Sequence, residues 1–296
     1  MQAIKTFWKN NWIGYFFLTP WLIGLIVLSA FPMGFSLYLA FTRYDLFSAP
    51  KWIGFGNFIE MFHDDKYLTS IKVTVHYVLF TVPLSLAFAL AVALLLNRGI
   101  RGLRVYRAIY YVPSLFGGSV AIALLWRQLF GGEGLMNSIL HFFGVEGMNW
   151  IATPSTSIYT LILLSTWQFG SAMVIFLAGL KQIPVDLYES ARIDGAGTVK
   201  QFRHITFPML TPILFFNLVM QIIHAFQAFT PAFIVSGGNG GPLNSTLFYT
   251  LYLYQKGFAQ FEMGYAAAMA WMLLLTVALI TSLLFVTSRN WVYYQE

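Results

Sequence analysis

The sequence predicts an all-α membrane protein that crosses the bilayer six times. Its 296 residues are 58% hydrophobic and only 9% charged, whereas a soluble domain carries roughly 25% charged residues. The mean hydropathy of +0.69 agrees, because so apolar a chain cannot cover a water-facing surface. There is no cysteine, which excludes disulfides and thiolate metal sites. We expect a single transmembrane domain over residues 1–296.

Six apolar runs reach the length of about 20 residues that a spanning helix needs. The first, 12–41, follows Lys5 and Lys9 and is too long for a signal-peptide core of about 7–15 residues, so we interpret it as a retained helix. The second and third flank an arginine-rich link, the fourth and fifth flank a polar segment at 181–207, and Arg289 follows the sixth. These five runs cover residues 68–97, 108–130, 155–180, 208–236 and 264–288.

The distribution of basic residues predicts the orientation, because cytoplasmic loops carry excess lysine and arginine. One side of the predicted topology holds six basic and seven acidic residues, and the other holds eleven basic residues. The eleven-residue side is expected to be cytoplasmic, with both termini inside. The net charge of +6 therefore reflects membrane orientation and not nucleic-acid binding. The eleven are Lys5, Lys9, Arg98, Arg101, Arg104, Arg107, Lys181, Arg192, Lys200, Arg203 and Arg289.

The polar segment 181–207 carries the most specific pattern in the chain. It reads Glu189-Ser-Ala-Arg-Ile-Asp-Gly195 and continues, nine residues after Gly195, with Ile205-Thr-Phe-Pro208. Pro184 suits the first position of a helix, and the helix dipole favours acidic residues in its first turns. We expect a short helix that ends in a tight turn at Gly195, followed by a helical segment from Thr198 to Thr206. An ordinary amphipathic linker is the alternative interpretation.

This pattern resembles the cytoplasmic signature loop of binding-protein-dependent ABC importer permeases, E-A-A-x-x-x-G-x9-I-x-L-P. Ser190 and Phe207 depart from it without changing charge. Other motifs resemble the carbohydrate permeases of the maltose and glycerol-phosphate type, including Phe17-Leu-Thr-Pro-Trp21, and the ending Trp291-Val-Tyr-Tyr294 resembles the first subunit of such pairs. The resemblance implies that the loop couples to an ATPase. The expected coupling residues are Asp186, Glu189, Ala191, Asp194, Gly195, Ile205 and Pro208.

The resemblance also implies the partners and the location. It predicts a bacterial plasma or inner membrane protein that pairs with a second, homologous permease, two ATPase subunits and an extracytoplasmic sugar-binding protein. The chain has no G-x4-G-K-[S/T] phosphate loop, so we expect ATP and Mg²⁺ on the ATPase subunits and no cofactor here. The five histidines lack metal-ligand spacing, and we predict neither a metal site nor catalytic residues.

Polar residues inside the spans indicate where a substrate passes, because they are costly in lipid and usually face a cavity. Gln221, His224 and Gln227 share one face of the fifth span, and the resemblance supports Gln168 and Gln227 as sugar contacts. Amides hydrogen-bond sugar hydroxyls. For the serines, Ser165 among them, a contact between helices is the preferred interpretation. The candidates for the substrate path are Gly118, Ser165, Gln168, Gln221, His224, Gln227 and Thr230.

We therefore expect half of the translocation pathway of an ATP-driven importer for a sugar or oligosaccharide. A secondary transporter is one alternative, but no aspartate or glutamate lies in the core of a predicted span to couple an ion. A six-span receptor or membrane enzyme is the other, and an enzyme would need a buried acid–base pair or metal cluster.

Overall fold

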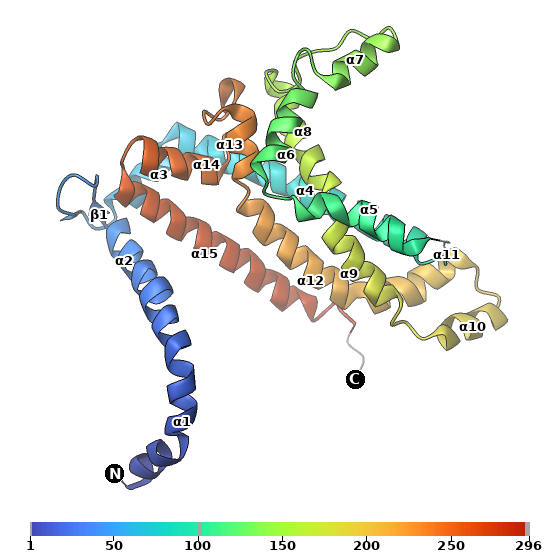
Figure 1. The fold of residues 1–296 in the computed structure, drawn as a ribbon, viewed down its shortest axis with the longest axis horizontal. Coiled ribbons are helices and arrows are strands. Elements are labelled where there is room, and N and C mark those ends of the chain that lie inside the picture. The colour runs from blue at the N-terminus through green and yellow to red at the C-terminus, as the bar shows by residue number, and fades with distance from the viewer. Residues whose placement is uncertain (1, 100–101, 294–296) are drawn as a thin grey trace. The chain divides into compact units, whose positions relative to one another are not determined.

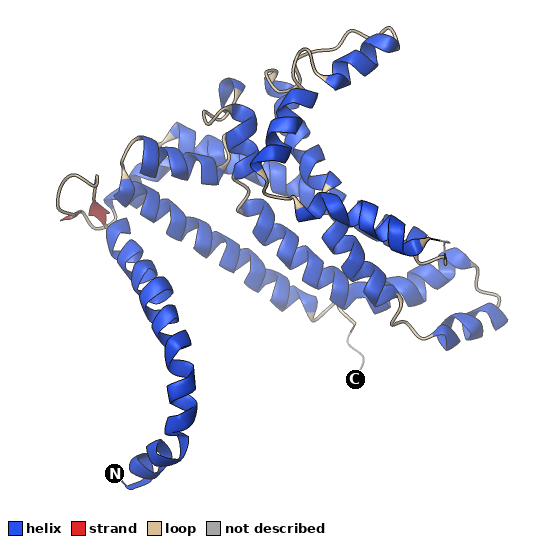
Figure 2. Cartoon of the chain, in the orientation of Figure 1, coloured by secondary structure: helices blue, strands red, loops and turns tan. Residues whose placement is uncertain are grey.

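The computed structural model describes residues 2–99 and 102–293, and side chains from residue 12 onward. Arg101 and Tyr294, which figured in the sequence analysis, lie outside the described residues. The described chain is mostly helical (Figure 2), which confirms the all-α class. Its described residues also include a short antiparallel hairpin, in which Thr42 of β1 (Thr42–Arg43) pairs with Trp52 of β2 (Lys51–Trp52).

The chain divides into two compact units. The first comprises residues 1–63 and 254–272. Its elements, labelled in Figure 1 where there is room, are α1 (Gln2–Gly24), the π-helix η1 (Leu25–Ala30), α2 (Phe31–Ala40), the hairpin, α3 (Gly56–His63), the π-helix η4 (Gln255–Ala259) and the first turns of α15 (Met263–Ser288).

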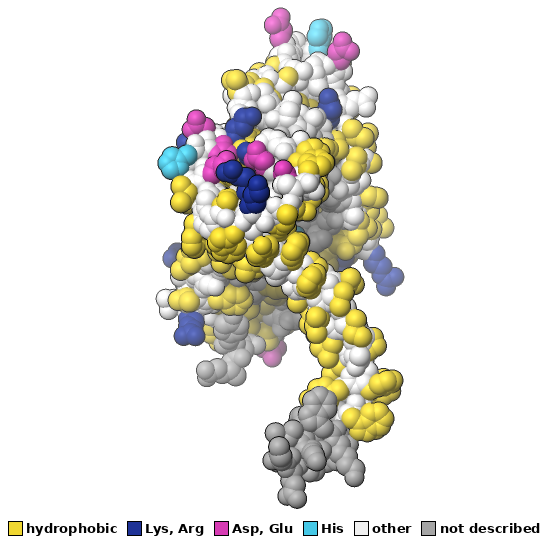
Figure 3. Space-filling view, turned by 90° about the vertical axis from the view of Figure 1, so that its left-hand side faces the viewer, with side chains coloured by type: hydrophobic (Ala, Val, Ile, Leu, Met, Phe, Trp, Pro, Cys, Tyr) yellow, Lys and Arg dark blue, Asp and Glu magenta, His cyan; other side chains and the backbone are white. Residues whose placement is uncertain are grey.

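Residues Trp12–Ala40 form one long helical segment of α1, η1 and α2 whose most apolar stretch has no buried residue. Hydrophobic side chains line it in Figure 3, as a surface in contact with lipid or another subunit requires. The π-helical turn precedes Pro32. Proline cannot donate to the carbonyl four residues back, and a widened turn accommodates this defect.

The second unit comprises residues 64–253 and 273–296, and its central element is α4 (Asp65–Leu96). Asp64 caps α4 by accepting hydrogen bonds from the backbone N–H groups of Lys66 and Tyr67. Around α4 pack α8 (Pro154–Trp167), α9 (Gly170–Leu180) and α12 (Phe207–Phe226). The remaining elements are α5 (Leu103–Leu115), α6 (Val120–Leu129), α7 (Leu135–Phe142), α10 (Val185–Ile193), α11 (Thr198–Gln201), the π-helix η2 (Phe202–Thr206), α13 (Thr230–Ser236), the 3-10 turn η3 (Pro242–Asn244) and α14 (Tyr249–Tyr254).

Two of the predicted spans are bent pairs of helices. Within the described residues, four helical segments are long and apolar enough to cross a membrane: 12–40, 65–96, 198–236 and 263–288. The predicted third span, 108–130, is instead α5 and α6, which meet at 96°, and the fourth is α8 and α9, which meet at 40°. The sharper bend follows Pro113 and contains Gly117 and Gly118, where a missing N–H and missing side chains end regular helix.

The tight packing of α9 against α5 gives a testable prediction. A Cβ atom on Gly170 would overlap the carbonyl oxygen of Tyr110. Gly170→Ala should therefore destabilise the chain by about 1–3 kcal/mol, the usual range for overpacking. Thermal unfolding in detergent measures this effect. Gly14→Ala is the control, because a Cβ atom there meets nothing within 4 Å, and equal melting of both variants would contradict the packing.

Candidate functional site

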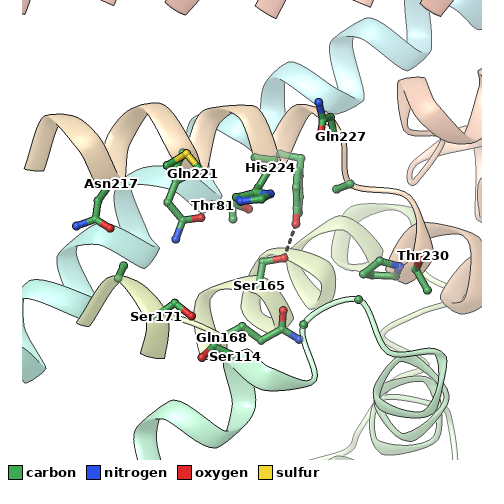
Figure 4. A pocket seen from close by; sticks show the side chains of 18 of the residues that line it. Thr81, Ser114, Ser165, Gln168, Ser171, Asn217, Gln221, His224, Gln227 and Thr230 are labelled. Carbon is green, nitrogen blue, oxygen red and sulfur yellow. Dashed lines mark hydrogen bonds between the residues drawn. The ribbon is translucent and has the colours of Figure 1, made fainter. Parts of the chain in front are cut away.

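A cavity of about 550 Å³ lies in the second unit, where α4, α5, α8, α9, α12 and α13 meet. All of the predicted substrate-path residues line this one cavity, although they come from separate parts of the chain (Figure 4). They are Gly118, Ser165, Gln168, Gln221, His224, Gln227 and Thr230.

Three breaks in helices open onto the cavity. They fall at residues 116–119 between α5 and α6, at 168–169 between α8 and α9, and at 227–229 between α12 and α13. Each break contributes to the cavity wall: Gly117 and Gly118 from the first, Gln168 from the second, and residues 227–229 from the third. A break frees backbone N–H and C=O groups, which are tolerated at membrane depth only where protein or a water-filled cavity satisfies them. The cavity wall therefore includes all three helix breaks as well as polar side chains.

The glutamine amides at the cavity are available to a ligand. The side chains of Gln168, Gln221 and Gln227 make no hydrogen bond with any other residue in the described part of the chain. Figure 4 shows Gln221 extending from α12 toward Ser171 and Ser114 on the opposite wall, whereas the amide of Gln227 points away from them. The Gln168 amide, at the break between α8 and α9, lies next to Gly117 in the break between α5 and α6. Gln168 and Gln221 are thus the better placed of the three.

Two cavity residues on α4 were missed by the sequence analysis. Tyr77 is 3% exposed, and its hydroxyl hydrogen-bonds that of Ser165 (dashed line in Figure 4), while Thr81 lines the same wall. The signal was present in the sequence, because Ser70, Thr74, Tyr77, Thr81 and Ser85 recur every three or four residues in the second span. Such a polar stripe marks the buried face of a membrane helix.

The segment 181–207 forms the predicted short helix and turn. Helix α10 follows Pro184 and ends at Ile193, with Asp194 as its C-cap, and Gly195 has φ of +73°. The Gly195 N–H donates to the Arg192 carbonyl at 3.0 Å, and the Ala196 N–H donates to the Ala191 carbonyl at 2.8 Å. This pair of bonds is the Schellman motif, which requires a left-handed residue at the position of Gly195. The tight turn expected at Gly195 is present.

The proposed coupling residues divide into an exposed set and a half-buried set. Asp186, Glu189, Asp194 and Gly195 are exposed, whereas Ala191, Ile205 and Pro208 are half-buried. Ala191, Asp194 and Ile205 come together around a hollow of about 340 Å³. The structure thus gathers three of the seven at one hollow and leaves Asp186, Glu189, Gly195 and Pro208 outside its lining.

A hydrogen bond connects the short helix to the helix that carries the cavity residues. The Tyr188 hydroxyl lies 2.9 Å from the Thr206 hydroxyl, and Thr206 is only 6% exposed. Thr206 ends the π-helix η2, which continues directly into α12. Helical structure therefore runs from α11 past Thr206 to Gln221 and His224 at the cavity, so a displacement of α10 can reach the cavity through one element.

Residues 53–292 match the family described as binding-protein-dependent transport system inner membrane component. The chain belongs to this family. It is 54% identical to the probable ABC transporter permease protein YesP of Bacillus subtilis (strain 168), over 100% of this chain and 96% of that protein. It is also 32% identical to the arabinooligosaccharides transport system permease protein AraP of the same organism, over 94% and 88%. The sn-glycerol-3-phosphate transport system permease protein UgpA of Yersinia enterocolitica is 32% identical over 100% of both chains.

Solved structures establish the fold. A chain of the bacterial alginate ABC transporter, in complex with an alginate pentasaccharide-bound periplasmic protein, superposes with a TM-score of 0.82. The identity is 22%, and the match covers 96% of each chain. This family member therefore has the ABC importer permease fold and is a multi-pass membrane protein.

Family membership also decides between the functional alternatives. The chain is a permease subunit of an ABC importer, a transport component and not an enzyme, and it works with a binding protein and partner subunits. This replaces the alternatives of a secondary transporter and of a six-span receptor or membrane enzyme. Among the described residues, no three histidine, aspartate or glutamate side chains gather as a metal site would require.

Proposed function

We propose that this chain forms half of the translocation pathway for a sugar or oligosaccharide. The observation that carries the proposal is the gathering of all seven substrate-path candidates around one cavity with unpaired amides. A cavity of about 550 Å³ is in the range of about 300–1,000 Å³ typical of small-molecule sites. The names of AraP and of a starch degradation products permease 29% identical to this chain support a carbohydrate substrate.

The proposed complex contains this chain, one related permease, two ATPase subunits and an extracytoplasmic sugar-binding protein. ATP and Mg²⁺ bind to the ATPase subunits. The excess of basic residues beside the segment 181–207 supports a cytoplasmic location for that segment and for both termini. The location is the plasma or inner membrane of a bacterial cell.

In the proposed mechanism, the helix α10 docks on an ATPase subunit through exposed Asp186 and Glu189 and the side-chain-free turn at Gly195. Closure of the ATPase pair moves α10. The Tyr188–Thr206 contact passes this displacement to α12, and α12 carries Gln221 and His224 at the cavity. Sugar hydroxyls exchange their water hydrogen bonds for the amides of Gln168 and Gln221, and movement of the helix breaks then exposes the cavity to the other side.

Reconstitution tests this function. The complex is purified through an affinity tag on this chain, its composition is determined by native mass spectrometry, and ATP-dependent uptake of labelled mono- and oligosaccharides into proteoliposomes is measured. We expect one copy of this chain, one related permease and two ATPase subunits, with uptake of at least one saccharide. Two copies of this chain without a second permease contradict the heterodimer, and uptake of peptides or amino acids alone contradicts the sugar pathway.

The contact between α10 and α12 gives a second prediction. Tyr188→Phe keeps the ring and removes the hydroxyl, and a hydrogen bond contributes about 0.5–1.5 kcal/mol net. Sugar transported per ATP hydrolysed should therefore fall roughly two- to twelvefold. Thr206→Val should lower the same ratio by a similar factor. The double variant should lower it little further, because both substitutions remove the same hydrogen bond. Additive losses would show that the two hydroxyls act independently.

A further inference from the structure

Helix α3 is attached to the end of the first long helical segment, within the first unit. The hairpin lies at that end of the segment (Figure 2), and α3 follows the hairpin in the chain. Asn57 of α3 is 5% exposed, and its Nδ2 donates to the carbonyl oxygens of Ala40 and Thr42, at 2.8 and 2.9 Å. Met61, one turn further along α3, is 1% exposed. One face of α3 is therefore buried, and its position relative to the end of α2 is fixed.

The opposite face of α3 is apolar and exposed. Phe55, Ile59 and Phe62 follow one another at steps of four and three residues, which places them on one face of a helix. Phe55 precedes α3 but already takes part in its hydrogen bonding, because its carbonyl oxygen accepts from the Ile59 N–H at 3.0 Å. The three side chains are 67%, 60% and 63% exposed, and Trp52 of β2 is 64% exposed. We call these four residues the α3 stripe. Large apolar side chains gathered on a surface mark a contact with another molecule.

Aromatic contacts join the α3 stripe to the exposed surface of the first span. Trp52 and Phe55 both pack on Phe41, with ring centroids 5.6 and 5.3 Å from its own. The ring of Trp52 also lies 5.9 Å from that of Tyr38, which lies 6.2 Å from that of Phe35 in α2. The most apolar stretch of the segment 12–40 has no buried residue. The α3 stripe therefore continues the apolar surface that the first span exposes.

The place of the α3 stripe in the sequence selects its occupant. Residues 10–42 contain no charged residue, whereas residues 43–66 contain seven. The stripe therefore lies where a membrane span gives way to water-facing sequence. Tryptophan and tyrosine are enriched at this boundary, because their rings are apolar while their N–H or O–H group stays hydrated. The charged neighbours Lys51 and Glu60 are of opposite sign, so the stripe offers no charge of one sign for a protein partner to match.

We propose that α3 lies in the membrane–water interface, with the α3 stripe inserted between the lipid headgroups and the start of the acyl chains. An amphipathic helix binds a bilayer in this way. In the proposed orientation this is the outer interface. Because Asn57 hydrogen-bonds the last residue of α2, the depth of α3 fixes the depth at which the first span ends. The inference goes beyond the proposed function, since it requires neither the sugar nor the ATPase.

The chain has no cysteine, so an introduced cysteine carries a nitroxide spin label at one known position. The complete complex is labelled in nanodiscs, and the wild-type complex, treated in the same way, gives the background from the other subunits. Labels at Ile59→Cys and Phe62→Cys should collide often with oxygen, which concentrates in lipid, and rarely with a water-soluble nickel chelate. The ratio of the two collision rates should exceed that at Glu60→Cys about fivefold. Glu60 is the matched control, because it is an exposed residue of α3 about 100° around the helix from Ile59.

Two results would overturn the proposal. Ready access of the nickel chelate to all three labels would place the α3 stripe in water. Shielding of the labels at Ile59→Cys and Phe62→Cys from both reagents would assign the stripe to a contact with another protein, and a repeat without the binding protein would show whether that protein covers it.

A second set of variants tests whether the stripe holds the helix in place. In the double variant Ile59→Asp with Phe62→Asp, a label at Phe55→Cys should lose about fivefold in its oxygen-to-nickel ratio, because charged side chains are costly below the headgroups. Glu60→Ala leaves the stripe intact and should keep the ratio, whereas an unchanged ratio in the double variant would contradict anchoring by the stripe. Reaction of Glu60→Cys with a membrane-impermeant maleimide in spheroplasts tests the outer location separately. Failure to react would contradict the proposed orientation and leave the depth measurement interpretable.

Discussion

Gly195→Val should lower both sugar uptake and substrate-stimulated ATP hydrolysis about tenfold. Gly195 has φ of +73° at the end of α10, a conformation that costs an L-residue about 1–2 kcal/mol, and a β-branched side chain is especially poorly accommodated there. That cost corresponds to a roughly 5- to 30-fold loss of the native turn. Uptake and ATP hydrolysis are measured in proteoliposomes, together with the amount of ATPase that copurifies with the permease.

Gly195→Asn is the matched control, which separates the backbone conformation of the turn from the shape of its surface. Gly195→Asn adds a side chain, but asparagine adopts the left-handed conformation more readily than other residues do, and a Cβ atom at this position meets nothing within 4 Å. If conformation alone matters, Gly195→Asn should retain most of the uptake. Loss in both variants would indicate that the ATPase approaches this turn so closely that no side chain fits. Wild-type activity of Gly195→Val would remove α10 from the coupling role.

The sequence predicts the helical architecture well because the bilayer restricts it. Long apolar runs must form helices in lipid, and the runs at 65–96 and 263–288 appear as unbroken helices. The 96° bend between α5 and α6 was not predicted. A hydropathy average does not register Gly117 and Gly118. A glycine pair in a membrane span can either bend the helix or let a straight helix pack closely on a neighbour. The surrounding helices determine which of these two outcomes occurs.

The parts of the candidate site that depend only on neighbouring residues in the sequence were predictable. The turn at Gly195 follows from the residue type and its position after a short helix, and the face of α12 follows from the spacing of Gln221 and His224. The polar stripe on α4 could have indicated that Tyr77 is buried, but not its partner, because Ser165 lies 88 residues away and meets it only through the packing of α4 against α8. The direction of the Gln227 amide also depends on the break at 227–229, which the sequence does not reveal.

Gln168→Leu should reduce uptake at low sugar concentration about tenfold, while basal ATP hydrolysis and assembly stay at the wild-type level. Leucine is similar in size to glutamine, so the bend between α8 and α9 should persist, since the backbone N–H of residue 168 still donates to Ser165. The variant removes the amide that would bind a sugar hydroxyl. A buried polar group left unpaired costs about 1–3 kcal/mol, or roughly 5- to 150-fold in affinity.

The loss should appear in the sugar concentration for half-maximal uptake, measured with the complex in proteoliposomes. Gln221→Leu should behave in the same way, because Gln221 faces the cavity from the opposite wall (Figure 4). Gln128→Leu is the control, since Gln128 is an exposed amide on α6 that does not line the cavity. Reduced assembly in the Gln168 and Gln221 variants, with normal uptake per assembled complex, would give these amides a packing role. Normal uptake in the double variant would mean that the sugar passes elsewhere, because no pathway through this cavity can avoid both walls.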